Sequence, residues 1–166
     1  MIADQQVAEA ENEHSAEKLD SVLNKAQKLM AVANTPVVLE TAIGGGLKEV
    51  AFARTPAMAS YLVALYAGEF ETLEGEQDGV KLRIITTEGK RASAAYALES
   101  TKRILAYFNE YFGTPYPLPK LDQIAVPNAF ATFGAMENWG AITYIDTALL
   151  YDPVTGSQAN RETVFQ

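Results

Sequence analysis

The 166-residue sequence predicts an α+β fold. Several short segments are rich in Val, Ile, Leu, Tyr and Phe and are bounded by Gly, Pro or polar residues, a composition typical of β-strands. Residues 92–112 instead carry apolar side chains at the spacing of one face of a helix. Strands combined with one long helix indicate a mixed architecture.

In the first half of the chain, strands are expected over residues 30–34, 37–40, 48–54 and 59–71. Thr35-Pro36 separates the first two strands, and the three glycines at 44–46 predict a turn. That glycine run lacks the Gly-Lys-Ser/Thr of a phosphate-binding loop. Because Tyr, Leu, Val and Phe dominate residues 59–71, we expect that strand to be buried.

The second half predicts a strand over 80–87, the helix over 92–112, and strands over 121–126 and 141–147. The broad apolar face of the helix is made by Ala94, Ala97, Leu98, Ile104, Leu105, Phe108 and Phe112. Gly113 favours a left-handed helix end and Pro115 cannot continue a helix, so the helix is expected to end at Phe112.

Residues 1–28 predict an amphipathic helix with acidic residues first and lysines later, which complements the helix dipole. Its apolar positions share one face: Leu19, Val22, Leu23, Ala26 and Leu29. The lone His14 lies among polar residues and lacks partners at helical spacing, so it is not expected to bind a metal.

A domain boundary is expected at the acidic segment Glu74–Gly79, which offers no apolar anchor. The expected organisation is therefore a helical leader at 1–28, a β-rich unit at 29–75 and a second unit at 79–166.

The formal net charge of −8 argues against nucleic acid and anionic membranes as partners, since both favour a basic face. The chain has no cysteine, so disulfides and thiolate metal sites are excluded. No apolar run is long enough for a transmembrane helix, and the N-terminus lacks the pattern of a signal peptide. A cytoplasmic location is therefore favoured.

The segment Phe133–Gly140 (FGAMENWG) concentrates the residues with recognition chemistry. Glycines let the backbone approach a ligand closely, while Glu137 offers a negative charge and Asn138 an amide beside it. This set suits recognition of a protonated amine next to a peptide backbone. The same residues also fit a plain turn with a solvated glutamate.

Residues 134–140 are similar to the exopeptidase signature of the M1 family of zinc aminopeptidases, the gluzincins related to aminopeptidase N. Residues 55–64 (TPAMASYLVA) resemble the strand that ends the family's first domain. Residues 112–122 (FGTPYPLPKLD) resemble the link from the first helix of its catalytic domain to the next strand, and residues 124–127 lead into the signature. The resemblance covers roughly residues 29–166, in the family's order.

The resemblance implies that residues 29–75 are the last strands of an N-terminal β-sandwich domain. Residues 79–166 would be the opening strand–helix–strand part of a thermolysin-like catalytic domain. The leader 1–28 does not resemble the family.

The resemblance also implies a role for each residue of the signature. Glu137 would bind the free α-amine of a peptide, and Gly134, Ala135 and Met136 would lie along the substrate as an edge strand. Asn138 would shape the loop. Phe133 would line the first side-chain pocket or, equally, be a core aromatic residue.

Zinc-dependent hydrolysis uses three protein ligands, and the family carries them on a His-Glu-x-x-His helix and a later glutamate. This chain has one histidine, His14, and its last residues, 163–166, resemble the family's lead-in to that helix. We therefore expect no metal ligands or catalytic residues within the chain, although the full-length family uses zinc.

Two further interpretations remain open. The chain could be a non-catalytic interaction module that self-associates through the apolar face of residues 17–30, or a truncated gene product without independent function. The position of the N-terminal helix would discriminate these interpretations, since an exposed apolar face indicates a partner surface.

Overall fold

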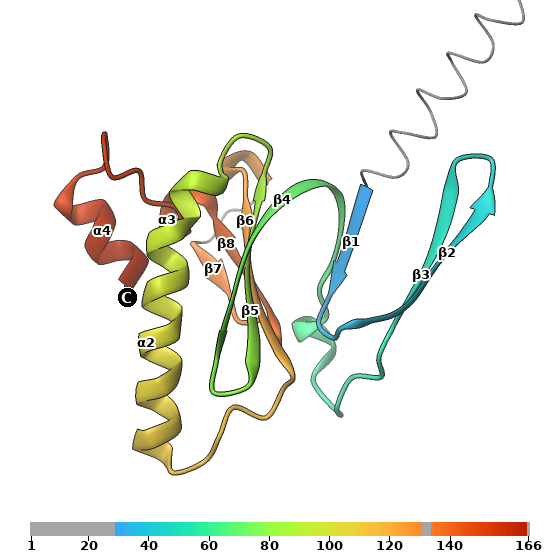
Figure 1. Ribbon diagram of the computed structural model, residues 1–166, viewed down its shortest axis with the longest axis horizontal. Coiled ribbons are helices and arrows are strands. Elements are labelled where there is room, and N and C mark those ends of the chain that lie inside the picture. Colours follow the sequence, from blue (N-terminus) through green and yellow to red (C-terminus); the bar gives the residue numbers. More distant parts are fainter. Residues whose placement is uncertain (1–28, 131–133, 166) are drawn as a thin grey trace, which may run out of the picture.

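The computed structural model describes residues 29–130 and 134–165 (Figure 1). The fold is mixed α+β, with one sheet of six strands, a separate two-stranded sheet and a few helices. In chain order the elements, with η for short 3-10 helices, are β1 (Leu29–Ala33), β2 (Val37–Gly44), β3 (Leu47–Phe52), η1 (Ser60–Leu62), β4 (Leu65–Gln77), β5 (Val80–Thr87), η2 (Arg91–Ala94), α2 (Ala95–Phe112), β6 (Lys120–Val126), η3 (Asn128–Phe130), β7 (Ala135–Met136), β8 (Ala141–Ile145), α3 (Asp146–Leu149) and α4 (Gln158–Phe165).

The large sheet has the strand order β1-β4-β5-β6-β8-β7. Strands β5, β6 and β8 are parallel, whereas β1, β4 and β7 run antiparallel to their neighbours. The helix α2 connects β5 to β6, as a parallel pair requires a crossover. The register places Arg83 of β5 opposite Asp122 of β6, and Ile124 of β6 opposite Thr143 of β8.

The long strand β4 joins β1 to the rest of the sheet. Its first part, Leu65–Glu69, pairs with β1, and its second part, Phe70–Gln77, pairs with β5. The segment Glu74–Gly79, where a domain boundary is expected, forms the end of β4 and its turn into β5. The placement of a boundary there remains a prediction.

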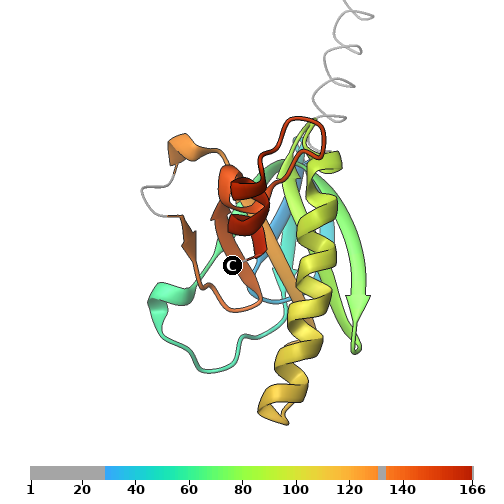
Figure 2. The same cartoon turned by 90° about the vertical axis from the view of Figure 1, so that its left-hand side faces the viewer.

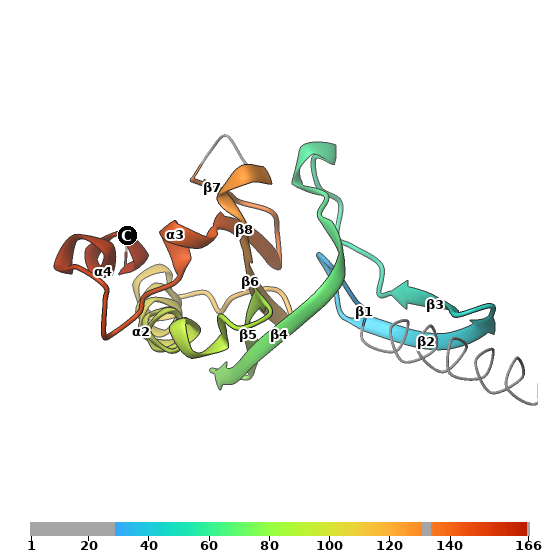
Figure 3. The ribbon, with the colours of Figure 1, turned by 90° about the horizontal axis from the view of Figure 1, so that it is seen from above.

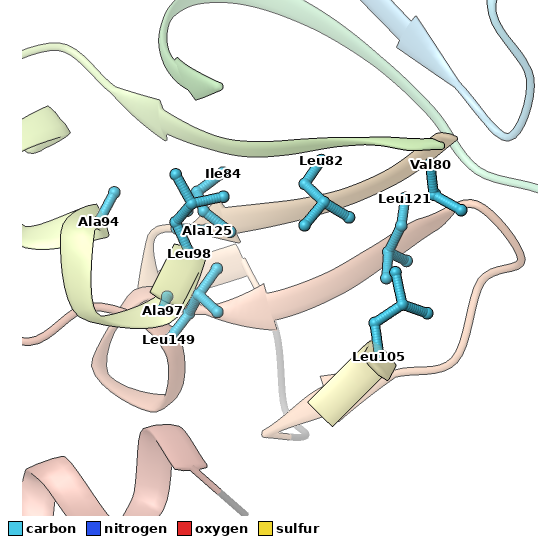
Figure 4. Close-up of a cluster of buried hydrophobic side chains, with 10 residues drawn as sticks. All are labelled: Val80, Leu82, Ile84, Ala94, Ala97, Leu98, Leu105, Leu121, Ala125 and Leu149. Carbon is cyan, nitrogen blue, oxygen red and sulfur yellow. The ribbon is translucent and has the colours of Figure 1, made fainter. Parts of the chain in front are cut away.

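The main core lies between α2 and one face of the sheet (Figure 2). Figure 4 shows side chains from the strands meeting those of the helix; the ten are Val80, Leu82, Ile84, Ala94, Ala97, Leu98, Leu105, Leu121, Ala125 and Leu149. A second cluster, which includes Val32, Ile85 and Ile124, contains residues of β1, β5 and β6. Strand β5 therefore contributes to both clusters, through Ile84 on one side and Ile85 on the other.

The hairpin β2–β3 projects away from the six-stranded sheet (Figure 3). Every residue of β2 is exposed. Its exposed apolar side chains include Val38, Leu39 and Ile43. Among the described residues, the hairpin therefore has no apolar layer over it.

Most of the predicted elements are confirmed. The strands at 30–34, 37–40, 48–54, 80–87 and 121–126 correspond to β1, β2, β3, β5 and β6. The helix ends at Phe112, and Gly113 takes the left-handed conformation with φ 60°. The helix predicted over 1–28 lies outside the described residues.

Three expectations are corrected. Residues 59–71 are not one buried strand, because Ser60–Leu62 form η1 and Tyr61, Val63 and Leu65 are 60–70% exposed. The strand predicted over 141–147 ends at Ile145, where α3 begins. The apolar face of α2 is buried only up to Leu105, since the sheet covers its first part and leaves Phe108 and Phe112 exposed.

No helix among residues 29–130 and 134–165 has both the length and the apolar character needed to cross a membrane.

Truncating the core should be far more costly than truncating the surface. Leu82 is fully buried, so Leu82→Ala should lower the free energy of unfolding by about 2–5 kcal/mol, because it leaves a cavity in the core. Leu65 is 70% exposed, and Leu65→Ala should change it by about 0.5 kcal/mol or less. Urea unfolding of both variants measures this, and equal losses would contradict the described core.

Candidate functional site

The residues of the signature form a loop at one edge of the sheet, here called the GAMEN loop (residues 134–140). It begins with the two-residue strand β7, in which Ala135 lies opposite Tyr144 and Met136 opposite Thr143 of β8. The Ile145 N–H also donates to the Gly134 carbonyl at 3.0 Å. Strand β7 is the last strand of the sheet, so within the described residues its outer side is open to another strand.

Glu137 follows this edge strand directly and is exposed. Its carboxylate has no ion pair or hydrogen bond with any residue that the structure describes. The chain turns immediately after it, because the Asn138 N–H donates to the Met136 carbonyl at 2.9 Å and the Ala141 N–H donates to the Asn138 carbonyl at 3.1 Å. The Glu137 carboxylate therefore lies on a hydrogen-bonded turn at the end of the edge strand, without a partner in the part of the chain that the structure describes.

Asn138 is 5% exposed, and its side chain faces the protein interior. Its Nδ2 donates to the Leu62 carbonyl at 3.2 Å, and its Oδ1 accepts from the Thr143 hydroxyl at 2.6 Å. Thr143 also contacts the Tyr66 hydroxyl through a hydrogen bond. Asn138 therefore ties the GAMEN loop to η1 and to β8, and its polar groups are used within the protein.

Asn34, at the end of β1, makes a second connection to the loop. Its Nδ2 donates to the Leu62 carbonyl at 2.9 Å and to the Trp139 carbonyl at 2.8 Å, and its Oδ1 accepts from the Ala64 N–H at 2.9 Å. Gly140 packs against the same residue: a Cβ there would overlap the Asn34 carbonyl oxygen, and φ is 69°. The loop thus leaves its turn at a point where only glycine fits.

A buried ionic cluster lies next to this point. The Lys120 ammonium donates to the Ala33 carbonyl at 2.8 Å, to the Gly140 carbonyl at 2.7 Å and to Asp122 Oδ2 at 2.6 Å. Arg83 donates to both oxygens of Asp122, at 2.7 and 2.5 Å. Lys120 is 4% exposed and Asp122 fully buried, so each charge has its opposite within contact, as buried charges require.

The cluster changes the proton affinity of its members. Burial lowers the pKa of Lys120, while the charge of Asp122 and its hydrogen bond act in the opposite direction. The hydrogen bond to Asp122 raises the pKa of Arg83. Burial, together with the charge of Asp122, raises the pKa of Tyr116 to about 12. These shifts follow from a carboxylate enclosed among cations and apolar side chains.

The residues that the structure describes do not form a zinc site. Among 29–130 and 134–165, no three His, Cys, Asp or Glu side chains gather so that they could hold a metal ion. The carboxylate of Asp122 is already bound to Lys120 and Arg83. The prediction that this chain binds no zinc is not tested by that observation and remains a prediction.

Comparison with known proteins relates this chain to a peptidase family. Residues 96–166 match the model of the Peptidase family M1 domain. The chain is 42% identical over 140 residues to "Aminopeptidase N" of Acetobacter pasteurianus, which covers 84% of this chain and 39% of that protein. It is 43% identical over 148 residues to "Aminopeptidase M1-B" of Oryza sativa subsp. japonica, covering 89% and 17%. It is 40% identical over 147 residues to "Puromycin-sensitive aminopeptidase" of Caenorhabditis elegans, covering 87% and 15%.

The chain belongs to peptidase family M1. It spans 39% of the length of the Acetobacter relative and less than a fifth of the length of the other two.

Of the site residues predicted for this M1 chain, the structure describes Gly134, Ala135, Met136, Glu137 and Asn138 in one continuous loop. Phe133 lies outside the described residues. Trp139 is 44% exposed, and its carbonyl accepts a hydrogen bond from Asn34.

Sequence reasoning missed the residues beneath the loop, namely Asn34, Arg83, Lys120 and Asp122. One signal was available: Lys120 and Asp122 lie two residues apart in a strand whose other residues, apart from Gln123, are apolar, so both point to one face. A strand that is covered on both faces has no solvated side for such charges, and each must therefore have a buried partner. The identity of those partners depends on strand register, which the sequence does not reveal.

An added methyl group should lower the free energy of unfolding strongly at one glycine of the loop and hardly change it at another. Gly140→Ala should lower the free energy of unfolding by about 2 kcal/mol or more, because φ is positive and the Cβ would overlap the Asn34 carbonyl. Gly134→Ala should change it by about 0.5 kcal/mol or less, because nothing lies within 4 Å of its Cβ position. Chemical unfolding of both variants checks this, and a tolerated Gly140→Ala would mean that the loop exit is placed differently.

Proposed function

We propose that this chain forms the part of an M1 aminopeptidase that holds the N-terminus of a peptide. In this proposal Glu137 binds the α-ammonium group, and Ala135 and Met136 bind the peptide backbone. The observation that carries the proposal is a carboxylate at the end of an edge strand, neither of which has a further partner among residues 29–130 and 134–165. The names of the relatives, which are aminopeptidases, support the same activity class.

The edge strand supplies the backbone interactions. One side of β7 is bonded to β8, so the peptide groups on its other side are available to an added strand. A peptide bound in this way would be held by main-chain hydrogen bonds whatever its side chains are. The strand has only two residues, so the added peptide would be aligned over a short length and would end near Glu137.

Glu137 then supplies the selectivity for a free N-terminus. A carboxylate attracts an ammonium group through a charge-assisted hydrogen bond, which is stronger than a neutral one. Because no described residue pairs with Glu137, an incoming cation displaces no existing partner. An acetylated N-terminus carries no charge and would lose this interaction while keeping its backbone contacts.

The same proposal assigns each of the two parts of the chain to a domain of an M1 enzyme. Residues 29–75 would be the last strands of an N-terminal β-sandwich domain, and residues 79–166 the opening part of a thermolysin-like catalytic domain. The match of residues 96–166 to the M1 domain model supports the second assignment. The exposed apolar residues of β2, such as Val38 and Leu39, are consistent with a strand that packs against further strands. Phe133 is assigned to the first side-chain pocket by resemblance alone.

We place the zinc centre of the enzyme outside these residues. Zinc would activate the water that cleaves the peptide bond in the full-length family. The described part of this chain offers no fitting set of ligands, so its contribution is to bind and orient the substrate.

A second candidate is an interaction module that self-associates through residues 17–30. Of that segment the structure describes only Leu29 and Met30, and Leu29 is 41% exposed. Sedimentation analysis of the chain with and without residues 1–28 tests this candidate, since self-association through this face requires that segment.

The proposed role of Glu137 predicts selectivity for a free amine. The tripeptide Leu-Ala-Ala should bind the chain about tenfold more tightly than its N-acetylated form, the scale of one hydrogen bond to a charged group. Glu137→Gln should abolish that ratio and leave binding of the acetylated peptide unchanged. NMR titration measures both affinities.

Glu88→Gln is the matched control, since Glu88 is an exposed glutamate in the turn after β5. It should keep the tenfold ratio. Equal affinity of the wild-type chain for both peptides would rule out the proposed role of Glu137.

The chain by itself should not hydrolyse peptides. Its one histidine, His14, does not provide a zinc ligand set, so no metal-activated water is available. Incubation of the purified chain and zinc with leucine p-nitroanilide should release no more p-nitroaniline than buffer with zinc. Zinc-dependent release that copurifies with the chain and disappears in Glu137→Gln would overturn this expectation.

A further inference from the structure

Two consecutive carbonyl groups at the exit of the GAMEN loop are each held by a buried side chain. The Trp139 carbonyl accepts a hydrogen bond from Asn34 at 2.8 Å, and the Gly140 carbonyl accepts one from Lys120 at 2.7 Å. Asn34 is 5% exposed and Lys120 4% exposed. Neither side chain belongs to the loop: one follows β1, and the other begins β6.

Both side chains use their whole donor capacity. The three protons of the Lys120 ammonium are matched by the Ala33 carbonyl, the Gly140 carbonyl and Asp122. The amide of Asn34 donates both its protons, to the Leu62 and Trp139 carbonyls. A fully satisfied buried donor has one low-energy position, because any displacement leaves a group unpaired. The two carbonyls are therefore held at fixed points.

The loop depends on this support because its own strand pairing is short. Strand β7 has two residues, and among the described residues one further backbone bond, from Ile145 to the Gly134 carbonyl, joins the entry of the loop to β8. On the exit side, the turn bond from Ala141 to the Asn138 carbonyl links the held carbonyls back to the residue that follows Glu137. The position of Glu137 therefore depends on the support at the exit together with the side chain of Asn138, which bonds to Leu62 and Thr143.

We propose that Lys120 and Asn34 are positioning residues, which hold the exit of the GAMEN loop so that the Glu137 carboxylate is placed for the substrate amine. This inference rests on the proposed function of Glu137. Neither residue is proposed to touch the substrate, since both are buried beneath the loop. The Ala33 carbonyl, bound by the same ammonium, extends the support to β1.

The alternative is that Lys120 only stabilises the fold. A residue with that role would change the unfolding temperature without changing the affinity of the folded protein. A positioning residue changes the affinity for a free amine at a temperature where the variant is fully folded, and it loosens the loop in the absence of any ligand.

The test uses the full chain and the variant Lys120→Met, which removes the ammonium and retains the apolar stem. We expect the preference for Leu-Ala-Ala over its acetylated form to fall from about tenfold to about twofold or less, because the Glu137 carboxylate is no longer held in position for the amine. In the free variant, the Asn138 and Ala141 amides should exchange with deuterium at least about tenfold faster, and by a larger factor than the amides of α2, which report the loss of global stability.

Leu82→Ala is the control for lost stability, because Leu82 lies in the core under α2 and outside the loop support. It should keep the peptide preference, and it should not speed exchange at Asn138 and Ala141 by a larger factor than at the amides of α2. If Lys120→Met does not fold, Asn34→Asp takes its place: it keeps the acceptor for the Ala64 N–H and loses both donors.

Chemical modification of a cysteine at position 120 tests whether the positive charge of the ammonium group is what the loop requires. The natural chain contains no cysteine, so Lys120→Cys introduces a single thiol that can be alkylated in denaturant before refolding. Alkylation with 2-bromoethylamine rebuilds an ammonium on a side chain close to lysine in length, and should restore the preference. Alkylation with iodoacetamide gives a neutral amide and should not.

The outcomes separate the two proposals. A wild-type chain with no preference for the free amine overturns the proposed function of Glu137. A wild-type chain with that preference, together with a folded Lys120→Met that keeps it or shows unchanged exchange at Asn138 and Ala141, overturns the positioning inference alone.

Discussion

The burial of the Lys120 ammonium is the constraint on which the arrangement of this site depends. An ammonium group removed from water loses several kcal/mol of hydration, which must be offset by close and well-oriented partners. Here those partners come from three separate parts of the chain: the end of β1, the loop exit and Asp122 of the same strand. The sheet, the loop and the first strands are therefore fixed to one another at a single point.

The carboxylate of Asp122, which pairs with Lys120, needs further hydrogen-bond donors. Asp122 is fully buried and would carry a strong penalty beside Lys120 alone, since one contact leaves most of its acceptor sites empty. Arg83 fills them with two hydrogen bonds, and the parallel register of β5 and β6 brings the two residues opposite each other. The strand pairing created by the α2 crossover is thus a condition for burying the lysine next to the loop.

Local parts of this fold could be predicted from the sequence because their causes are local. The strand at 80–87 and the helix that ends at Gly113 follow from composition, periodicity and a glycine at the helix end. Residues 59–71 were placed wrongly because their apolar composition resembles a core strand, whereas Tyr61, Val63 and Leu65 face outward among the described residues. An apolar composition shows that a segment tends to be buried. Whether another part of the protein packs over it depends on the tertiary structure.

The same distinction applies to the site. The signature around Glu137 is contiguous in sequence, and therefore could be found there. The support beneath it joins Ala33 to Lys120 and Asn34 to Trp139, residues separated by 87 and 105 positions. Nothing in the neighbourhood of Asn34 marks it as a partner of the loop, because asparagine after a strand and before Thr-Pro is typical of an ordinary turn.

The charged residues of this site form two groups: three that pair with one another, and Glu137, which is exposed. Lys120 and Arg83 both bond to Asp122, so the three side chains hold one another in a fixed geometry, and their formal charges sum to +1. Glu137 lies on the surface without a partner among the described residues. A side chain that recognises a ligand must be held in a fixed position and must lack a partner of its own. A flexible carboxylate loses entropy on binding, and a paired one must first give up its partner. In the proposed role of Glu137, the buried cluster would meet the first condition and leave the second intact, since its bond to the loop ends on the backbone carbonyl of Gly140 and no described residue pairs with the carboxylate.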